Sequence, residues 1–400
     1  MKARKIQMQQ LFGFIVILYV ATNMLAQTKF SGMLPMGALV TVSRILVYAF
    51  LLLRLVVSST IRKSQLLLLP LIIGLAVIVT FTSERTIIID TLVILLAARK
   101  YDPYKIMWDA CRVQFVILAI TIIASMVGII DNTAIIQIGY SFAREGLGFN
   151  YTTYGANYFF HLVLVYLLIK GDKLKIWHVV VIEIVNAFIY IKTNTNAVFV
   201  MCGIVTILTY LAKFIKKPID ENGILKTVFY SVFPISVFTA FFTAINYNPS
   251  NARWFVLNSL LAGRLRLAHI ALTEYTISPL GQLVQWNTSL QKSFSDTVGY
   301  FYVDSSYINI ALVYGWIILA LVCIAYIALM KKGVKDNNVF LCITISFLAL
   351  HSIFDPQLIE LRYNLMLLCL APVLNLDGLR TLGKKREDNI YSAGVGRTKV

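Results

Sequence analysis

The chain has 400 residues, of which 58% are hydrophobic and 14% are charged. Soluble domains carry roughly 25% charged residues and fewer apolar ones, so this composition excludes an ordinary soluble protein. The net charge of +17 would indicate a nucleic-acid partner in a soluble protein. Here the basic residues form short clusters between apolar blocks, as in the cytoplasmic loops of membrane proteins. The composition therefore indicates an all-α, polytopic membrane protein that contacts membrane lipids and binds no nucleic acid.

Twelve apolar blocks, each long enough or nearly long enough to cross a hydrocarbon layer as a helix, follow one another along the chain. The first follows a basic N-terminal segment with no small-residue cleavage site, so it is predicted to be a span rather than a signal peptide. The blocks form one membrane domain, residues 1–376, and the basic segment 377–400 is expected to be a disordered cytoplasmic tail. The predicted spans are residues 11–26, 33–53, 66–82, 86–98, 110–130, 155–170, 175–191, 197–213, 225–247, 304–329, 339–354 and 361–376.

The distribution of basic residues predicts the orientation of these spans. With the N-terminus inside the cell, 26 of the 36 Lys and Arg residues fall in cytoplasmic segments and nine fall outside, while Arg44 lies within a span. Cytoplasmic loops carry the excess of basic residues, so this split supports twelve spans in the cell membrane, with both termini in the cytoplasm. The longest connection, residues 248–303 between the ninth and tenth spans, then lies outside. We expect any functional site on this extracytoplasmic face.

The long outer loop contains an amphipathic pattern over residues 253–275. At 100° per residue, Arg264 lies in the middle of the apolar face of a single helix, whereas Arg266 lies on the polar face. A buried guanidinium needs an anionic partner. That partner is either a bound anion such as phosphate or a carboxylate such as Asp304 or Asp355, unless the side chain reaches lipid headgroups. For Arg266 a solvated position is the favoured interpretation.

Residues 351–364 join the last two predicted spans on the outside. His351 and Asp355 are four positions apart, and a carboxylate one helical turn from an imidazole can orient it for general acid–base catalysis. Pro356 discourages helix at the residue before it. On spacing alone we therefore favour a histidine at a helix end, followed by an aspartate in a turn.

The second outer loop, residues 141–157, holds Arg144 among glycines and aromatic residues. Its tyrosines, Tyr151 and Tyr154, suit either stacking on sugar rings or a belt at the membrane interface, and the belt is the simpler interpretation.

Three ionisable residues, Arg44, Asp90 and Glu183, lie within predicted spans. Such residues are costly in a bilayer and indicate function by default. The alternative is mutual neutralisation, with Arg44 paired to Asp90 or Glu183, and we favour this structural pairing slightly.

The sequence lacks the common signatures of cofactor and metal sites. The five cysteines are scattered, odd in number and form no CxxC pair, which indicates neither a disulfide framework nor a zinc site. There is no GxxxxGK[ST] loop for ATP, no DxD pair and no GxSxG elbow. We therefore expect no metal and no cofactor.

Short segments of the outer loops carry a family resemblance. They are Ala262-Gly263-Arg264 followed by Pro279-Leu280-Gly281-Gln282, then Val303-Asp304-Ser305-Ser306-Tyr307 with Tyr314-Gly315, and finally His351-Ser352-Ile353-Phe354-Asp355-Pro356-Gln357. Together with the number of spans, these segments resemble the Wzy-type polysaccharide polymerases of the O-antigen ligase/polymerase superfamily. Segment 144–157 is similar to the shorter outer loop of that family. Many members have Ser-Gly-Arg where this chain has Ala-Gly-Arg, a departure that leaves the arginine intact.

The resemblance implies a metal-independent glycosyltransferase of O-antigen, capsule or exopolysaccharide synthesis. Such a polymerase transfers a growing glycan from undecaprenyl diphosphate to the non-reducing end of a lipid-linked repeat unit at the outer face. The implied substrates are undecaprenyl-diphosphate-linked oligosaccharides, and the implied protein partners are a flippase and a chain-length regulator. The implied diphosphate-binding residues are Arg264, Arg144 and Arg266, and the implied catalytic residues are His351, Asp355 and Asp304.

Three other functions fit parts of the pattern. A flippase for lipid-linked oligosaccharides would have similar spans, but it does not call for a long outer loop with Arg264 and Arg266. A secondary transporter would show matched halves with broken helices at corresponding positions, and no such halves stand out. The sibling O-antigen ligase uses similar chemistry on another acceptor, and the sequence hardly separates it from a polymerase.

Overall fold

Helices follow one another along nearly all of the chain in the computed structural model, which describes residues 2–57, 63–136, 143–215, 218–219, 223–288 and 300–372. The α-helices are α1 Lys2–Leu25, α2 Met36–Val57, α3 Lys63–Ser83, α4 Ile87–Ala98, α5 Pro103–Met126, α6 Tyr154–Lys170, α7 Ile176–Thr193, α8 Asn196–Ala212, α9 Gly223–Ile245, α10 Ala252–Leu260, α11 Arg264–Glu274, α12 Ser306–Val313, α13 Trp316–Lys335 and α14 Val339–His351. Three short 3-10 helices are η1 Lys29–Gly32, η2 Gly171–Lys173 and η4 Leu365–Leu370. Strands β1 Ala134–Ile136 and β2 Ala143–Glu145 pair antiparallel. The all-α class is therefore confirmed.

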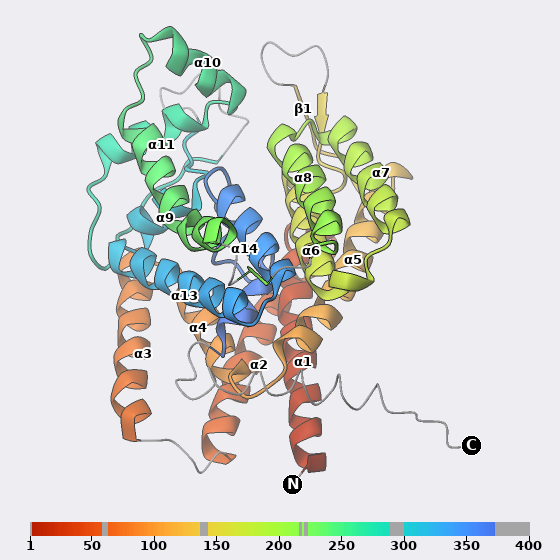
Figure 1. Ribbon diagram of the computed structural model, residues 1–400, viewed down its shortest axis with the longest axis vertical. Helices are drawn as coiled ribbons and strands as arrows, with labels where there is room; N and C mark the ends of the chain where they lie inside the picture. The colour runs from red at the N-terminus through yellow and green to blue at the C-terminus, as the bar shows by residue number, and fades with distance from the viewer. Residues whose placement is uncertain are drawn as a thin grey trace.

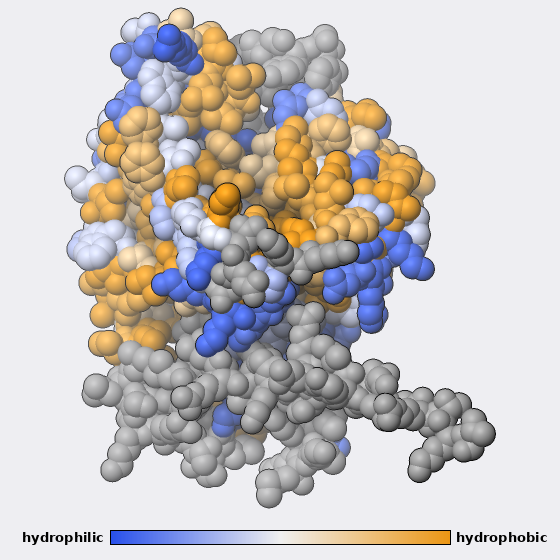
Figure 2. Space-filling view, viewed as in Figure 1, coloured by the Kyte–Doolittle hydropathy of each residue, from blue (hydrophilic) through white to orange (hydrophobic). Residues whose placement is uncertain are grey.

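Six helices of the described chain are long and apolar enough to cross a membrane, namely α1, α2, α5, α7, α9 and α13. There are also four shorter apolar helices among the described residues, namely the part of α3 from Pro70 to Ser83 and the whole of α4, α8 and α14. Large apolar side chains such as Ile184, Ile191 and Ile207 point outward from α7 and α8. This side of the molecule is accordingly hydrophobic in Figure 2. An outer surface of this kind suits lipid rather than water, as expected of a helical membrane protein.

The interior of the bundle is formed by largely apolar helices that are buried on nearly every side. All eight residues of α12 are buried, as are most of those of α6. The helix α14 packs against α6, α8 and α9. A helix that is hydrophobic all round belongs in the interior, so α6 and α12 serve as the scaffold on which the outer helices lie.

Polar residues at helix starts explain where several elements begin. The Asp102 side chain accepts a hydrogen bond from the Tyr104 N–H (3.0 Å), and Pro103 occupies the first helical position of α5. Asn338 caps α14 in the same way, by accepting from the Leu341 N–H (3.2 Å). Such caps satisfy amide groups that have no partner within the helix.

One end of the bundle carries α10, α11 and the β1–β2 sheet, and we call it the loop end. It lies opposite the amino end of α1 (Figure 1). Hydrogen bonds between residues that are distant in sequence connect the segments here. The Asn150 N–H donates to the Gln27 carbonyl (2.9 Å), and the Thr82 hydroxyl donates to the Leu280 carbonyl (2.6 Å).

The predicted span 304–329 is wrong as a single helix. It is divided into α12 and α13 at Tyr314 and Gly315, where Gly315 has a φ of +91°. Residues 278–282 lie in this break, since the Gln282 N–H donates to the Val313 carbonyl (3.0 Å) and the Trp316 N–H donates to the Ser278 carbonyl (3.1 Å). Backbone groups from the loop thus replace helical hydrogen bonds, which an apolar sequence pattern cannot reveal.

The predicted single helix over residues 253–275 is also wrong. It is two helices, α10 and α11, bent by 108°. Ala262 and Gly263 between them both have a positive φ, a conformation that ends a helix. The predicted apolar face survives only on α11, where Leu267, Ala268 and Ala271 are buried. The tail 377–400 and the end of the predicted span 361–376 lie outside the described residues, and within that span only η4 is regular.

Candidate functional site

Arg264 and Asp304 form an ion pair at the loop end. Arg264 is the first residue of α11, directly after the bend at Gly263, and Asp304 lies two residues before α12. The Nε atom of Arg264 donates to Oδ2 of Asp304 at 2.9 Å. Of the partners that the sequence left open, the structure thus shows a carboxylate. The side chains are 21% and 23% exposed, so this pair remains within reach of a ligand.

Only one edge of the Arg264 guanidinium is used in this pair. In the part of the chain that the structure describes, no other residue accepts a hydrogen bond from it. The two terminal nitrogens therefore keep N–H groups that can bind a second anion. A planar fork of this kind suits phosphate oxygens.

Arg144 and the Arg264–Asp304 pair both act electrostatically on Tyr151. Arg144 sits on β2 and its Nε donates to the Thr193 carbonyl (2.9 Å), which fixes it to the end of α7. The charges of Asp304, Arg144 and Arg264 all act on the Tyr151 hydroxyl. The structure therefore brings Arg144 and Arg264 to a common neighbour, although they are 120 positions apart. Tyr151 adjoins charged groups here, which does not favour its assignment to a lipid belt.

Asp355 is a buried neighbour of the same pair. The Nδ2 group of Asn157 donates to its Oδ2 at 2.5 Å, and its backbone carbonyl accepts from the Ser306 N–H (3.1 Å). Burial, together with the charge of Asp304, raises the pKa of Asp355 well above its usual range. The second oxygen of Asp355 and the amide oxygen of Asn157 both lack a partner among the described residues. If Asp355 holds a proton, its O–H group can donate a hydrogen bond to an acceptor such as the amide oxygen of Asn157.

The raised pKa of Asp355 predicts a pH dependence of stability. In the unfolded chain an aspartate titrates near pH 4. Because the folded pKa is higher, the folded protein binds more protons between the two values, and stability is lost as the pH rises through this interval. The melting temperature of the wild type in detergent should fall more steeply from about pH 4 upward than that of Asp355→Asn. Parallel curves for the two proteins would contradict a protonated Asp355.

The alternative in which His351 lies one helical turn from Asp355 is not what the structure shows. Helix α14 ends at His351, so the two residues are not one helical turn apart, and no hydrogen bond joins their side chains. Instead the buried His351 ring lies 4.4 Å from the Phe160 ring and 5.6 Å from the His161 ring, measured between centroids. The interpretation as a helix-end histidine followed by an aspartate in a turn is the one that fits.

Arg266 is separate from this cluster. Its side chain is exposed, and its backbone N–H donates to the Asn258 side chain (3.0 Å). The solvated position that its place on the helix predicts therefore agrees with the structure. Arg266 is well suited as a control for variants of Arg264, since both lie in the first turn of α11.

A second ion pair at the loop end joins Arg362 and Glu360, which sequence reasoning did not single out. The Nε and Nη2 groups of Arg362 lie 2.7 Å and 2.5 Å from Oε2 of Glu360. The guanidinium also lies 5.6 Å from the centre of the Tyr363 ring. The sequence feature that could have indicated this pair is a glutamate and an arginine two residues apart at the start of the last apolar block.

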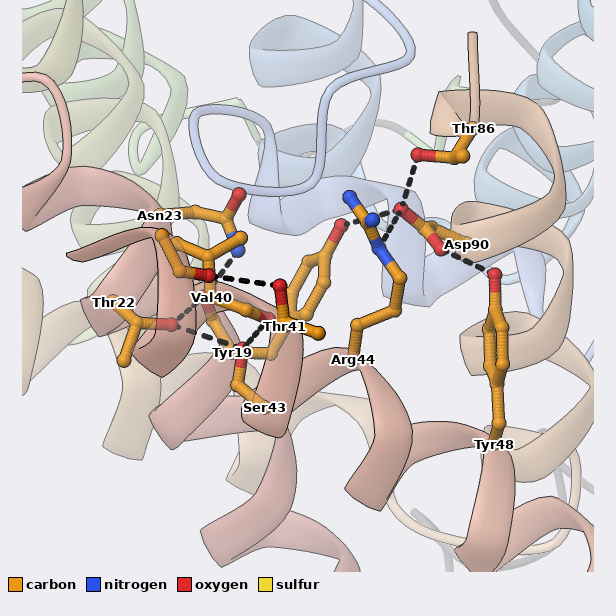
Figure 3. Close-up of polar contacts among 11 residues, drawn as sticks. Tyr19, Thr22, Asn23, Val40, Thr41, Ser43, Arg44, Tyr48, Thr86 and Asp90 are labelled. Carbon is orange, nitrogen blue, oxygen red and sulfur yellow. Dashed lines mark hydrogen bonds and ion pairs between the residues drawn. The ribbon is translucent and has the colours of Figure 1, made fainter. Parts of the chain in front are cut away.

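The buried carboxylate of Asp90 is the centre of a polar cluster (Figure 3). Its Oδ2 accepts from Arg44 Nε (3.0 Å) and from the Thr86 hydroxyl (3.0 Å), and its Oδ1 accepts from the Tyr48 hydroxyl (2.5 Å). The pairing of Arg44 with Asp90, one of two that the sequence offered, is confirmed. Glu183 is not part of it, since the amide of Asn186 is its hydrogen-bond donor (3.3 Å).

Removal of Asp90 should destabilise the protein strongly. Asp90→Ala leaves the half-buried Arg44 without its counter-charge, which typically costs about 3–5 kcal/mol. Arg44→Leu combined with Asp90→Leu removes both charges and should recover most of the loss. Thermal unfolding in detergent compares these proteins. Equal melting temperatures for Asp90→Ala and the wild type would show that the pair contributes nothing.

The described residues define an all-α helical protein with the apolar helices of a membrane protein and a cluster of charged and aromatic residues at one end. Among these residues, no group of three or more His, Cys, Asp or Glu side chains is placed to hold a metal ion. Comparisons of the chain with protein-family models, with curated proteins and with solved structures find no match. What the protein does has to be inferred from its own residues.

Proposed function

We propose that the protein is a polysaccharide polymerase that joins lipid-linked repeat units at the extracytoplasmic face of the cell membrane. In this proposal the chain has twelve spans, both termini lie in the cytoplasm, and the loop end faces outward. The observation that carries the proposal is the Arg264–Asp304 pair, which acts together with Arg144 on Tyr151. Cationic forks next to a carboxylate and an aromatic ring suit a substrate that combines a diphosphate with sugars.

The proposed reaction requires no nucleotide and no metal of the protein. The bond between the anomeric carbon of the donor glycan and its diphosphate oxygen breaks, and a bond from that carbon to an acceptor hydroxyl oxygen forms. The diphosphate leaves with the bonding electrons, so negative charge develops on its oxygens. Arg264 and Arg144 would stabilise that charge through fixed guanidinium groups.

The proton of the acceptor hydroxyl needs a receiving group, and Asp304 is the better placed of the candidates. Its carboxylate is partly exposed, and a diphosphate that draws the Arg264 fork to itself leaves an oxygen of Asp304 free. Burial and the charge of Asp304 raise the pKa of Asp355, which suits it to donate a proton rather than to accept one. His351 is buried against Phe160 and His161 and acts as the base only if these move.

The test is to delete the gene in its native host and to size the surface glycan and the lipid-linked intermediates. A polymerase predicts loss of long chains, with single repeat units left on lipid and facing outward. Repeat units that accumulate on the cytoplasmic face would instead identify a flippase. An unchanged glycan would refute the proposal and favour a transporter of other solutes. Long chains that remain on lipid and fail to reach their final acceptor would identify the sibling ligase.

A further inference from the structure

The loop end holds two arginine–carboxylate ion pairs that differ in geometry, because Nε alone of Arg264 faces Asp304, whereas Nε and Nη2 of Arg362 both face Oε2 of Glu360. Arg264 is paired with Asp304, and Arg362 is paired with Glu360. In each pair the guanidinium is partly exposed, 21% for Arg264 and 29% for Arg362, so neither is a closed interior salt bridge. Arg264 was expected from the sequence to bind a diphosphate, whereas nothing so far gives Arg362 a role.

A row of tyrosines connects the two ion pairs. The Tyr151 and Tyr154 rings are 5.6 Å apart between centroids, and Tyr154 and Tyr363 are 6.4 Å apart. Tyr151 adjoins the Arg264 pair, and Tyr363 adjoins Arg362. Tyr154 lies between them, and charges from both pairs, those of Arg362 and Glu360 and that of Asp304, act on the pKa of its hydroxyl. Tyr151 and Tyr154 are half-buried, so each presents part of its ring to a ligand, whereas the Tyr363 ring is buried and supports Tyr154 from below the surface.

We infer that Arg362 binds a second lipid diphosphate, that of the acceptor repeat unit, and that Tyr151 and Tyr154 lie under the sugars between the two diphosphates. This inference rests on the proposed function. Polymerisation joins two molecules that each carry a lipid diphosphate, and both must be bound at once. Two diphosphates repel each other, so each requires its own cationic group, with the length of the joined sugars between them.

The surroundings of Arg362 suit this role. Arg85 is exposed, and its charge and that of Arg362 both act on the Tyr314 hydroxyl. Glu360 and the side-chain oxygen of Gln27, which lies 3.2 Å from Nη1 and 3.3 Å from Nη2, hold the Arg362 fork in position when no ligand is bound. An arriving diphosphate replaces one of these oxygens with its own. Aromatic faces between the two ends offer flat apolar surface to pyranose rings.

The experiment counts molecules of undecaprenyl diphosphate bound to the purified, full-length protein in detergent, by native mass spectrometry, against an excess of phosphatidylglycerol. The wild type should bind two. Arg362→Gln with Glu360→Gln, which removes both charges of that pair, should bind one. The matched variant Arg264→Gln with Asp304→Asn should also bind one, and the protein with all four substitutions should bind none.

Arg362→Lys provides an independent variant if the double substitution fails to fold. It keeps the charge opposite Glu360 but loses the fork, so it should weaken only the second binding event, by roughly tenfold. A wild type that binds one molecule, lost with Arg264 and kept without Arg362, would overturn the inference and leave the proposed polymerase standing. Two molecules bound by the Arg362 variants with unchanged affinity would overturn it as well. No binding above phosphatidylglycerol would overturn both.

Discussion

An Arg264→Gln protein should reach the membrane in normal amount and yet leave the deletion strain with single repeat units in place of long chains. Arg264 contributes a guanidinium that is already oriented by Asp304 and keeps two nitrogens for a ligand. Loss of one fixed donor to a developing oxyanion typically lowers a turnover rate by about 10²–10³-fold. A defect of that size abolishes long chains, which gel analysis of the surface glycan detects directly.

Two matched variants separate this effect from a general loss of structure. Arg266→Gln changes an exposed arginine two residues further along α11 and should leave chain length unchanged. Arg264→Gln with Asp304→Asn removes both partners, so no carboxylate is left without a counter-charge, and it should be as inactive as the single variant. Long chains made by either Arg264 variant at normal expression would show that this arginine takes no part in the reaction.

The high cost of burying an unpaired charge was the principle that predicted side-chain partners best from the sequence. Arg264 lies on a face with Leu267, Ala268 and Ala271, and the cost of burying a lone guanidinium required a partner for it. Asp304 was one of two carboxylates named, and the structure shows that pair. The same reasoning anticipated the pairing of Arg44 with Asp90. In both cases the energetic penalty is large enough to restrict the possible partners to a few residues.

Contacts between segments that are distant along the chain could not be predicted from the sequence, because they depend on how the helices pack. Asn157 and Asp355 are 198 positions apart, and only the fold places the amide beside the carboxylate. The spacing of His351 and Asp355 suggested a closer relation than exists, because the helix ends at the first of them. Local periodicity predicts which side of a helix is buried, but it carries no information about which other helix lies there.

Helix breaks were missed because apolar character continues through them. The stretch around Tyr314 is hydrophobic on both sides, so hydropathy predicts one span. The relevant signal is Gly315, whose φ of +91° is rarely adopted by other residues. Gly263 gives the same signal between α10 and α11, with a φ of +83°. A glycine with a positive φ can be recognised only once the backbone is known.

Gly315→Ala should be among the most destabilising single substitutions in the chain. A Cβ atom at Gly315 would come within 3.0 Å of the carbonyl oxygen of Pro279 and the amide nitrogen of Gly281. These are backbone atoms, which cannot swing aside as the end of a side chain can. Overpacking of this kind and the strain of a positive φ together should cost about 4 kcal/mol or more. Thermal unfolding of the purified protein in detergent measures the loss.

Gly263→Ala is the control that separates crowding from backbone strain. Gly263 has nearly the same φ, +83°, but a Cβ atom there would meet nothing within 4 Å. Its substitution should therefore cost only the strain of the left-handed conformation, about 1–2 kcal/mol. If Gly315→Ala lowers the melting temperature no more than Gly263→Ala, the loop does not pack into the break as described.

The break at Gly315 also bears on the site, because residues 278–282, which lie in the break, connect α3, α12 and α13. The Gln282 N–H holds the end of α12, and the Leu280 carbonyl accepts from Thr82 at the end of α3. Asp304 lies just before the other end of α12. A variant that displaces the loop thus shifts the support of the carboxylate that positions Arg264. We therefore expect any Gly315→Ala protein that still folds to lose long-chain synthesis, whereas Gly263→Ala isolates the effect of strain beside the arginine itself.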